Sequence, residues 1–202
     1  MADLPLIQFN NWRDPQGYRL ENSNQLVVRN GRRKDNFDVL EPLKNKVLYS
    51  AFANVVITPE SLLKFVQSYG PLTERGHDQG DEVRRVLWHA ARMRDLLKIM
   101  LAQRKNRGLA KTSGFPNLVL HAAIDWERRT FAPRWAFRPN TLLDGLWLQL
   151  GQAITRGTRL QTCSLCGDWF EVGYPSDRRL DSKFCCDEHR VQYNSQKRSK
   201  GG

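Results

Sequence analysis

Two short stretches decide how the C-terminal part of this chain folds: Cys163-Ser164-Leu165-Cys166-Gly167 and Cys185-Cys186-Asp187-Glu188-His189. All four cysteines of the 202-residue chain lie in them, and 18 residues separate Cys166 from Cys185. A secreted disulfide framework would spread its cysteines through the fold. A C-x2-C pair followed about 15–20 residues later by a second close pair is typical of a zinc site. The sequence therefore predicts a metal site in this tail.

Three side chains compete for the two ligand positions that the first pair leaves open. Cys185 and His189 are one helical turn apart, so both would project from one face of a helix. Cys186 and His189, three residues apart, are also compatible with a helix. We favour Cys185, because Phe184 can then pack below the site and the helix can begin at Cys186. We expect one structural Zn²⁺ in a closed site, with no position open for a water nucleophile. Its ligands would be Cys163, Cys166, Cys185 and His189.

The residues between the two pairs predict a hairpin. Trp169–Val172 has the composition of a strand, Gly173 opens a turn, and Leu180–Phe184 would return as the second strand. A knuckle, a hairpin and a ligand-bearing helix in this order form a treble clef. We assign this zinc-binding treble-clef module, with its basic C-terminal helix, to residues 159–202.

Residues 1–158 are expected to form a larger domain, so that the whole protein is of the α+β class. This domain would be mainly helical, with a strand-containing N-terminal part. Thr58-Pro59 predicts the start of a helix that ends at Gly70. Apolar residues recur at three- and four-residue steps from Val83 to Leu101, which indicates a long helix beginning near Asp81.

Other segments of the larger domain give weaker signals. Asn30-Gly31, directly after Leu26–Arg29, predicts a hairpin turn. Residues 47–57 fit a buried strand or a helix, and residues 118–137 one or two strands. A last helix would be capped by Asn140 and ended by Gly157.

Charge and composition narrow the classes of function. Lys and Arg number 32 against 21 Asp and Glu, a formal charge of +11 that indicates a polyanionic partner, nucleic acid before a membrane surface. No apolar run approaches the roughly 18 residues that span a bilayer. Met1–Pro5 lacks the features of a secretory signal, so we expect a cytoplasmic protein. The chain has no phosphate-binding glycine loop and no nucleophilic triad, and we expect it not to be an enzyme.

The order of parts resembles the bacterial CGNR zinc-finger proteins with an N-terminal ABATE domain. The resemblance rests on a helix ending at Tyr69-Gly70-Pro71-Leu72, an Arg-rich helix over 81–105 and a helix over 141–156. It continues in Arg156-Gly157-Thr158-Arg159-Leu160, then Cys163-x-x-Cys166-Gly167-Asp168-Trp169-Phe170, and closes with Arg178-Arg179 and Phe184-Cys185. Where that family shows Cys-Gly-Asn-Arg, this chain has His189-Arg190-Val191-Gln192. The resemblance implies a DNA-binding transcription regulator with an ABATE-like domain over 1–158.

The basic residues of the module are candidates for nucleic-acid contacts, DNA before RNA. Cations would neutralise phosphates, while Asn194, Gln192, Gln196 or one of the arginines would read base edges. The predicted contacts are Arg178, Arg179, Lys183, Arg190, Asn194, Lys197, Arg198 and Lys200.

Two alternatives stay open. The module can be a zinc-stapled adaptor that meets an acidic protein partner. The chain can also be an RNA-binding protein linked to a ribosome or a toxin–antitoxin system. For that class, aromatic residues near arginines would stack on bases. The candidates are Trp12, Tyr18, Trp126 and Trp135.

Overall fold

The computed structural model describes residues 6–7, 9–30, 37–45, 47–77, 79–103, 120–126, 133–173, 176 and 178–199. The helices within these residues are η1 (Pro42–Lys44), α1 (Leu48–Ala53), α2 (Pro59–Tyr69), η2 (Arg75–His77), α3 (Val83–Gln103), α4 (Leu142–Thr155) and α5 (Asp187–Ser199). The strands are β1 (Leu6–Ile7), β2 (Asn11–Arg13), β3 (Tyr18–Glu21), β4 (Leu26–Arg29), β5 (Asp38–Leu40), β6 (Asp81–Glu82), β7 (Leu120–Trp126), β8 (Pro133–Pro139), β9 (Arg159–Thr162) and β10 (Trp169–Val172).

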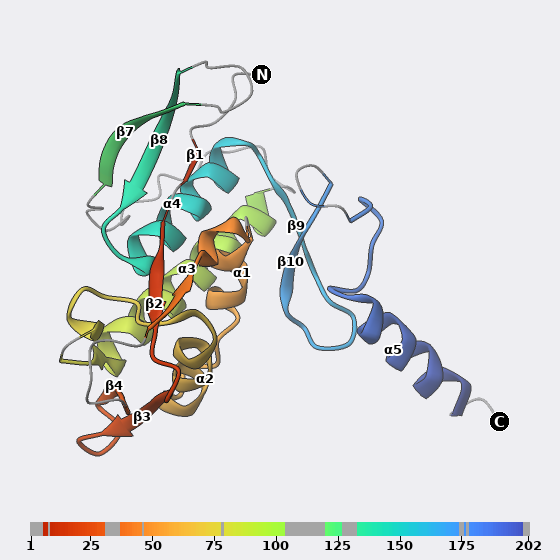
Figure 1. The fold of residues 1–202 in the computed structure, drawn as a ribbon. Coiled ribbons are helices and arrows are strands. Elements are labelled where there is room, and N and C mark those ends of the chain that lie inside the picture. The colour runs from red at the N-terminus through yellow and green to blue at the C-terminus, as the bar shows by residue number, and fades with distance from the viewer. Residues whose placement is uncertain are drawn as a thin grey trace.

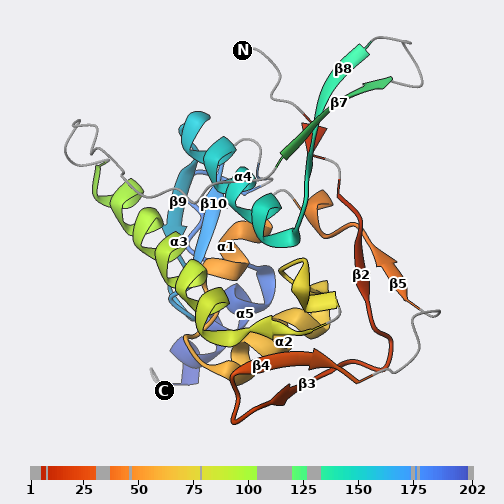
Figure 2. The same cartoon turned by 90° about the vertical axis from the view of Figure 1, so that its left-hand side faces the viewer.

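The strands form small sheets around a helical body. β3, β4 and β6 make one antiparallel sheet, β2 pairs antiparallel with β5, and β7 pairs antiparallel with β8. β1 joins β8 in parallel, and β9 pairs with β10 in a separate antiparallel hairpin. Figure 1 shows α1 to α4 grouped together, with β9, β10 and α5 to one side. Figure 2 shows the β2–β5, β3–β4 and β7–β8 pairs at the margins of the helical body. The chain thus has the mixed helical and β character that the sequence predicts.

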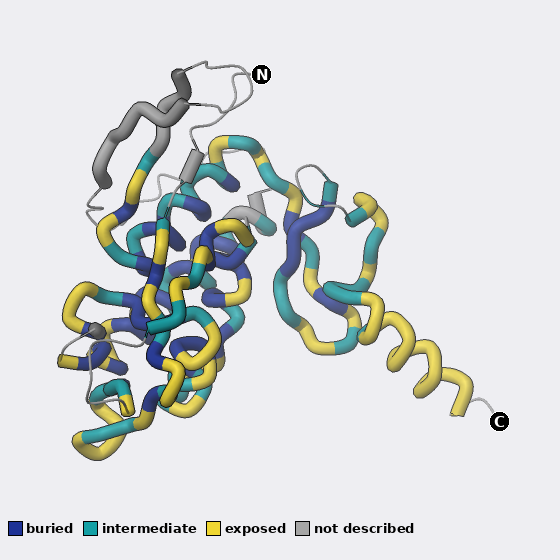
Figure 3. Tube along the Cα trace, in the orientation of Figure 1, coloured by how far each residue is buried: buried dark blue, intermediate teal, exposed yellow. Residues whose placement is uncertain are grey.

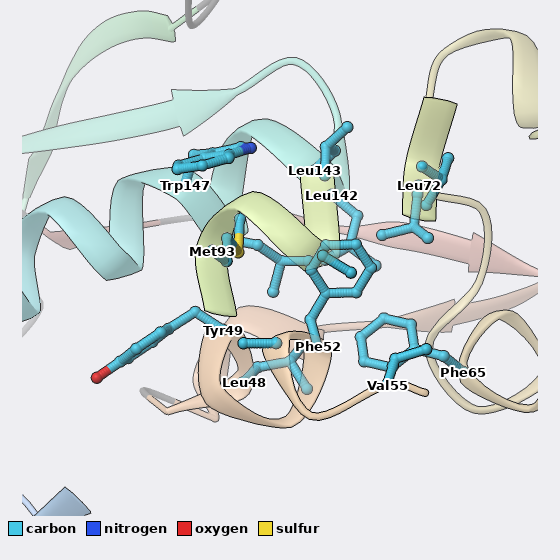
Figure 4. Close-up of a cluster of buried hydrophobic side chains, with 14 of the residues drawn as sticks. Leu48, Tyr49, Phe52, Val55, Phe65, Leu72, Met93, Leu142, Leu143 and Trp147 are labelled. Carbon is cyan, nitrogen blue, oxygen red and sulfur yellow. The ribbon is translucent and has the colours of Figure 1, made fainter. Parts of the chain in front are cut away.

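One apolar core joins α1, α2, α3 and α4. Leu48 and Phe52 of α1, Met93 of α3 and Leu142 of α4 are all 0% exposed (Figure 4). Because these side chains come from three helices separated in sequence, their burial fixes how the helices cross, and each fully buried side chain contributes roughly 1.5–3 kcal/mol.

A buried histidine completes this core. Trp147 donates its indole N–H to Nδ1 of His89 at 3.1 Å, which satisfies two polar groups inside the body. Burial, helped by the charge of Arg85, lowers the pKa of His89 to about 4, so the ring is neutral near pH 7. His89 therefore has a packing role.

The helix boundaries follow local signals in the sequence. Thr58 accepts a hydrogen bond from the backbone N–H of Ser61 at 3.3 Å, and α2 begins at Pro59 as predicted. The start of α4 is a correction, because its cap is Thr141 and not Asn140. Thr141 accepts from the backbone N–H of Asp144 at 3.1 Å, and the Asp144 carboxylate accepts from the N–H of Thr141. This capping box satisfies two backbone donors, where a lone asparagine would satisfy one.

A hairpin turn lies before Leu26–Arg29. β4 pairs with β3, and residues 22–25 connect them. Asn22, Ser23 and Asn24 of this turn have φ values of 51°, 54° and 66°. The predicted turn at Asn30-Gly31 extends into residue 31, which lies outside the described residues.

The two ambiguous segments are resolved by the structure. Within residues 47–57 the chain forms α1, and residues 118–137 contain β7 and most of β8. Among the described residues, no helix combines the length and the apolar character needed to cross a bilayer.

Candidate metal centre

The first cysteine pair lies in the turn of the β9–β10 hairpin. The last residue of β9, Thr162, pairs with the first of β10, Trp169, and the six residues between them form the knuckle. The backbone N–H of Cys163 donates to the carbonyl of Asp168 at 2.8 Å, and that of Gly167 donates to the carbonyl of Cys163 at 2.9 Å. Gly167 has a φ of 75°, a left-handed conformation that a side chain would strain.

The predicted hairpin partner of β10 is wrong. Trp169–Val172 is a strand as predicted, but it pairs with β9, and Leu180–Phe184 contains no strand. The reason is local: β9 leads directly into the knuckle, so the turn itself brings the two strands together. The segment before α5 instead returns as irregular chain, with the carbonyl of Lys183 accepting from the N–H of Ser164 at 2.9 Å.

The second ligand pair lies at the start of α5. Cys185 comes two residues before the helix and His189 is in its first turn. The helix begins at Asp187, one residue later than predicted, with Asp187 and Glu188 in its first turn. Acidic side chains there are favourable because they face the positive end of the helix dipole.

These two pairs place four donor atoms together. The three Sγ atoms and one ring nitrogen of His189 all lie within 4.8 Å of one another. Nδ1 of His189 is 3.7 Å from Sγ of Cys163 and 3.0 Å from Sγ of Cys185, and the Sγ atoms of Cys166 and Cys185 are 3.8 Å apart. Tetrahedral zinc ligands at about 2.0–2.3 Å from the ion stand roughly 3.4–3.8 Å apart. Cys163, Cys166, Cys185 and His189 can therefore hold a metal ion.

Cys186 is outside this group. Its Sγ lies 3.9 Å from Sγ of Cys185, but it does not belong to the set of four mutually close donors. The geometry thus agrees with the choice of Cys185 as the third thiol ligand.

The electrostatics of the site favour a cation. Burial would raise the pKa of the Cys163 thiol, but the backbone N–H groups of Cys166, Cys185 and Leu165, together with His189, lower it to about 6. Burial and the neighbouring thiols raise the pKa of Cys185 far above its ordinary value. Three thiolates at this spacing repel one another, and a bound divalent ion removes that penalty because thiolates bind it directly.

A small apolar cluster supports the site. Phe170 and Val172 of β10 are buried with Cys163, and Leu165 and Phe184 pack against them. Phe184 thus has the supporting role that the sequence predicts for it.

Arg178, one of the predicted nucleic-acid contacts, lies within this support. Its guanidinium donates to the carbonyl of Cys185 and lies 5.7 Å above the centre of the Phe170 ring. The side chain is half-buried. A phosphate would have to compete with both of these internal contacts for the guanidinium. The sequence around Arg178 contains no local pattern that predicts either contact.

The other predicted contacts are on the surface. Arg179 forms a two-pronged ion pair with Asp181 at 3.1 and 3.2 Å, and Arg190 pairs with Asp187 at 3.1 Å. Lys183 is exposed, and Lys200 lies outside the described residues. Asn194, Lys197 and Arg198 are exposed on α5. The structure therefore gathers four of the predicted contacts on one helix: Arg190, Asn194, Lys197 and Arg198.

α5 stands apart from the rest of the molecule. Along its 13 residues no side chain is buried, and only His189 is half-buried (Figure 3). It contacts the rest of the module through His189 in its first turn and through Tyr193, whose ring lies 5.2 Å from that of Phe184.

The hairpin is fastened to the helical body by polar pairs. The Asn54 side-chain amide donates to the carbonyl of Trp169 at 3.1 Å and its oxygen accepts from the N–H of the same residue at 3.1 Å. The Tyr49 hydroxyl donates to Oε1 of Glu171 at 2.5 Å, and both residues are buried. Leu160 of β9 is part of the main core.

The aromatic residues proposed to stack on RNA bases differ in exposure. Tyr18 is 4% exposed and its hydroxyl accepts the N–H of Asp14 at 2.9 Å, so burial excludes it from stacking. Trp12 is 47% exposed. The side chains of Trp126 and Trp135 lie outside the described part of the chain.

Comparisons with protein-family models, with curated proteins and with solved structures give no significant match. The resemblance to the CGNR proteins stays a prediction.

Proposed function

We propose that this protein binds duplex DNA through α5, as a transcription regulator, with a structural zinc ion that holds the base of the helix. The observation that carries the proposal is that α5 is exposed over its length and fastened at one end to the metal-ligand cluster. A 13-residue helix is about 20 Å long, and the major groove of B-DNA admits a helix of this kind.

The charge along α5 fits a phosphate backbone. From residue 190 to residue 199 the helix carries three cations and no acidic side chain. Arg190, Asn194 and Arg198 follow at steps of four, so they lie along one side of the helix. Two cations would contact phosphates while the amide between them reads a base edge, and Asn pairs with adenine in the major groove.

Zinc is the proposed ion because the donor set is three thiols and one imidazole. Closed sites of this composition are typical of structural zinc, with every position filled by protein. In this proposal the ion has no catalytic role, and the protein is not an enzyme.

The test is the salt dependence of binding to a duplex of mixed sequence. Each phosphate contact contributes about 0.9 to the slope of log K against log salt for B-DNA. Arg190→Ala with Arg198→Ala should lower the slope by about 1.8 and weaken binding to all sequences alike. The matched control, Lys64→Ala with Lys98→Ala, removes the same charge from exposed positions on α2 and α3 and should leave the slope unchanged.

Two further measurements complete the test. Asn194→Ala should cost about 1–3 kcal/mol on one sequence only, if that residue reads a base. The zinc content of the arginine variant should equal that of the wild type, because neither arginine is a ligand. No binding of the wild type to duplex DNA or to RNA at about 150 mM salt would reject the proposal in favour of an acidic protein partner. Binding to RNA alone would favour the RNA-binding alternative.

A further inference from the structure

A hollow of about 730 Å³ lies on the helical body, between the β3–β4 turn and the first turns of α3. Its apolar wall includes Leu26, Ile57, Leu87 and Trp88. The volume is within the roughly 300–1,000 Å³ of small-molecule sites, which combine an apolar lining with a few polar groups. None of the residues that line it belongs to the metal centre or to α5.

An exposed tryptophan forms one side of the hollow. Trp88 is 56% exposed and Ile57, on the connection between α1 and α2, is 46% exposed. Large apolar side chains are normally withdrawn from water, so two of them beside one hollow indicate a surface that a ligand covers. The indole N–H of Trp88 has no hydrogen-bond partner within the described residues, and its ring is available for stacking.

Amide side chains form the opposite rim. Asn22, Asn24 and Gln25 of the β3–β4 turn line the hollow, and their side-chain amides make no hydrogen bond within the part of the chain that the structure describes. The turn is held at the start of α3, because the N–H of Val83 donates to the carbonyl of Gln25 at 2.9 Å. The backbone of the rim is therefore held in place, and its side chains offer both donors and acceptors.

The turn that carries these amides is strained. Asn22, Ser23 and Asn24 are three consecutive non-glycine residues in the left-handed region, with φ of 51°, 54° and 66°. This region is unfavourable for residues with a side chain, although Asn tolerates it better than most residues. Glycine would remove the strain and also the amide. Residues in uncommon backbone conformations cluster at ligand-binding and active sites.

The charges at the rim select against an ionic ligand. Glu82 and Arg84 both line the hollow and have opposite signs. Their fields oppose each other, so neither a phosphate nor a carboxylate is favoured. An uncharged, flat molecule with an edge of mixed donors and acceptors matches the stacking surface and the amides together.

We propose that this hollow binds a planar heteroaromatic base of the purine or pyrimidine type, stacked on Trp88 with its polar edge toward Asn22, Asn24 and Gln25. Side-chain amides form paired hydrogen bonds with such edges, and the indole ring stacks on any base. The base can belong to a free nucleoside or to an unpaired position of a polynucleotide, since the hollow would recognise the same chemistry.

The experiment is calorimetric titration of the full chain with adenosine, guanosine, cytidine and uridine, with ribose and benzoate as comparison probes. At least one nucleoside should bind, and Trp88→Ala should weaken it on the order of 5- to 150-fold, the equivalent of stacking one base. Asn24→Gly should weaken the same nucleoside while leaving the thermal midpoint of unfolding equal or higher, because it removes an amide and relieves strain. Val39→Ala, which truncates another exposed large apolar side chain, is the control and should bind as the wild type does.

Each result decides for or against the proposal. No binding by any of the four nucleosides at millimolar concentration would overturn it, and so would an equal loss in the Val39 and Trp88 variants. Benzoate binding as tightly as the best nucleoside would also overturn it. The side-chain amides would then not recognise the polar edge of the base. Tighter, Trp88-dependent binding of a single-stranded ten-nucleotide probe would assign the base to a polynucleotide; binding of nucleosides alone would assign it to a free ligand. The Arg190 and Arg198 substitutions should leave nucleoside binding unchanged, so this inference and the DNA proposal can fail separately.

Discussion

Adjacent cysteines have different positions at the start of α5. Sγ of Cys185 is within 4.8 Å of the other three donors, whereas Cys186 is outside the group. The difference follows from side-chain direction, because neighbouring residues ahead of a helix point to different sides of the chain. Arg178 and Arg179 are also adjacent, and they differ in the same way: Arg178 is half-buried beneath the site, whereas Arg179 is exposed.

We predict that Cys185→Ser expels the metal and that Cys186→Ser retains it. A hydroxyl is a poor replacement for a thiolate on zinc, while the Cys186 side chain binds nothing in the site. Metal analysis of the purified proteins should give one zinc per chain for the wild type and for Cys186→Ser, and close to none for Cys185→Ser. The reverse pattern would show that Cys186 is the ligand, and substoichiometric zinc in the wild type, prepared without chelator, would reject the zinc site itself.

Among the elements, α5 differs most from the rest. α2, α3 and α4 each bury an apolar side in the main core, but α5 has no buried residue. Isolated helices shorter than about 12–15 residues are marginal in water, and most helices gain their stability from packing. α5 therefore depends on its attachment through Cys185 and His189.

We predict that a chelator removes α5 while the body persists. Structural zinc contributes on the order of 10–16 kcal/mol in small peptides, so the segment from the knuckle to the C-terminus should lose its order. Circular dichroism should lose the helical signal of 13 residues. Hydrogen exchange should show α3 and α4 still protected, because their core contains none of the four ligands. The Cys185→Ser variant should already resemble the chelated protein. A single cooperative loss of all helical signal would contradict this and show that body and module share one folding unit.

At the scale of the whole molecule, the contact between body and module includes a buried polar pair beside the apolar contact of Leu160. Tyr49 extends from the edge of the main core (Figure 4), and its hydroxyl reaches Glu171 on β10. Oε2 of Glu171 is buried with no hydrogen-bond partner within the described residues. Burial raises the pKa of Glu171, although the Tyr49 hydrogen bond and the charge of Arg156 act in the opposite direction.

This contact predicts a pH dependence of stability. The folded protein holds the Glu171 proton at pH values where the unfolded chain, with a pKa near its ordinary value of 4.5, has released it. Stability from this group is complete below that value and is lost as the pH rises through the raised pKa. Glu171→Gln has no proton to lose and keeps an oxygen that accepts the Tyr49 hydroxyl. Its stability relative to the wild type should therefore increase from about pH 5 toward pH 8.

Denaturant unfolding of the zinc-loaded proteins measures this difference. The metal ligands titrate alike in both proteins, so their contribution cancels in the comparison. Tyr49→Phe is the companion variant and should destabilise the fold by about 1–3 kcal/mol, the cost of leaving a buried acceptor without its partner. A constant difference between Glu171→Gln and the wild type across this pH range would mean that Glu171 does not change its protonation on folding.

The sequence alone determined the features that depend on short-range geometry. The spacing within residues 163–189 predicted the four donors, because a knuckle and one helical turn bring such side chains together whatever the rest of the fold. Thr58 and Gly157 likewise marked helix ends through hydrogen bonds to their own neighbours.

Only the tertiary structure decided which segments meet across long stretches of chain. Asn54 finds Trp169 and Tyr49 finds Glu171 at separations of 115 and 122 residues, and no local pattern encodes either pair. The sequence did not predict the partner of β10 or the internal contacts of Arg178 for the same reason. The residue pattern of a strand or of a basic segment does not determine which part of the chain packs against it. A buried polar group needs a partner, but the partner is whichever one the packing of distant elements brings within reach.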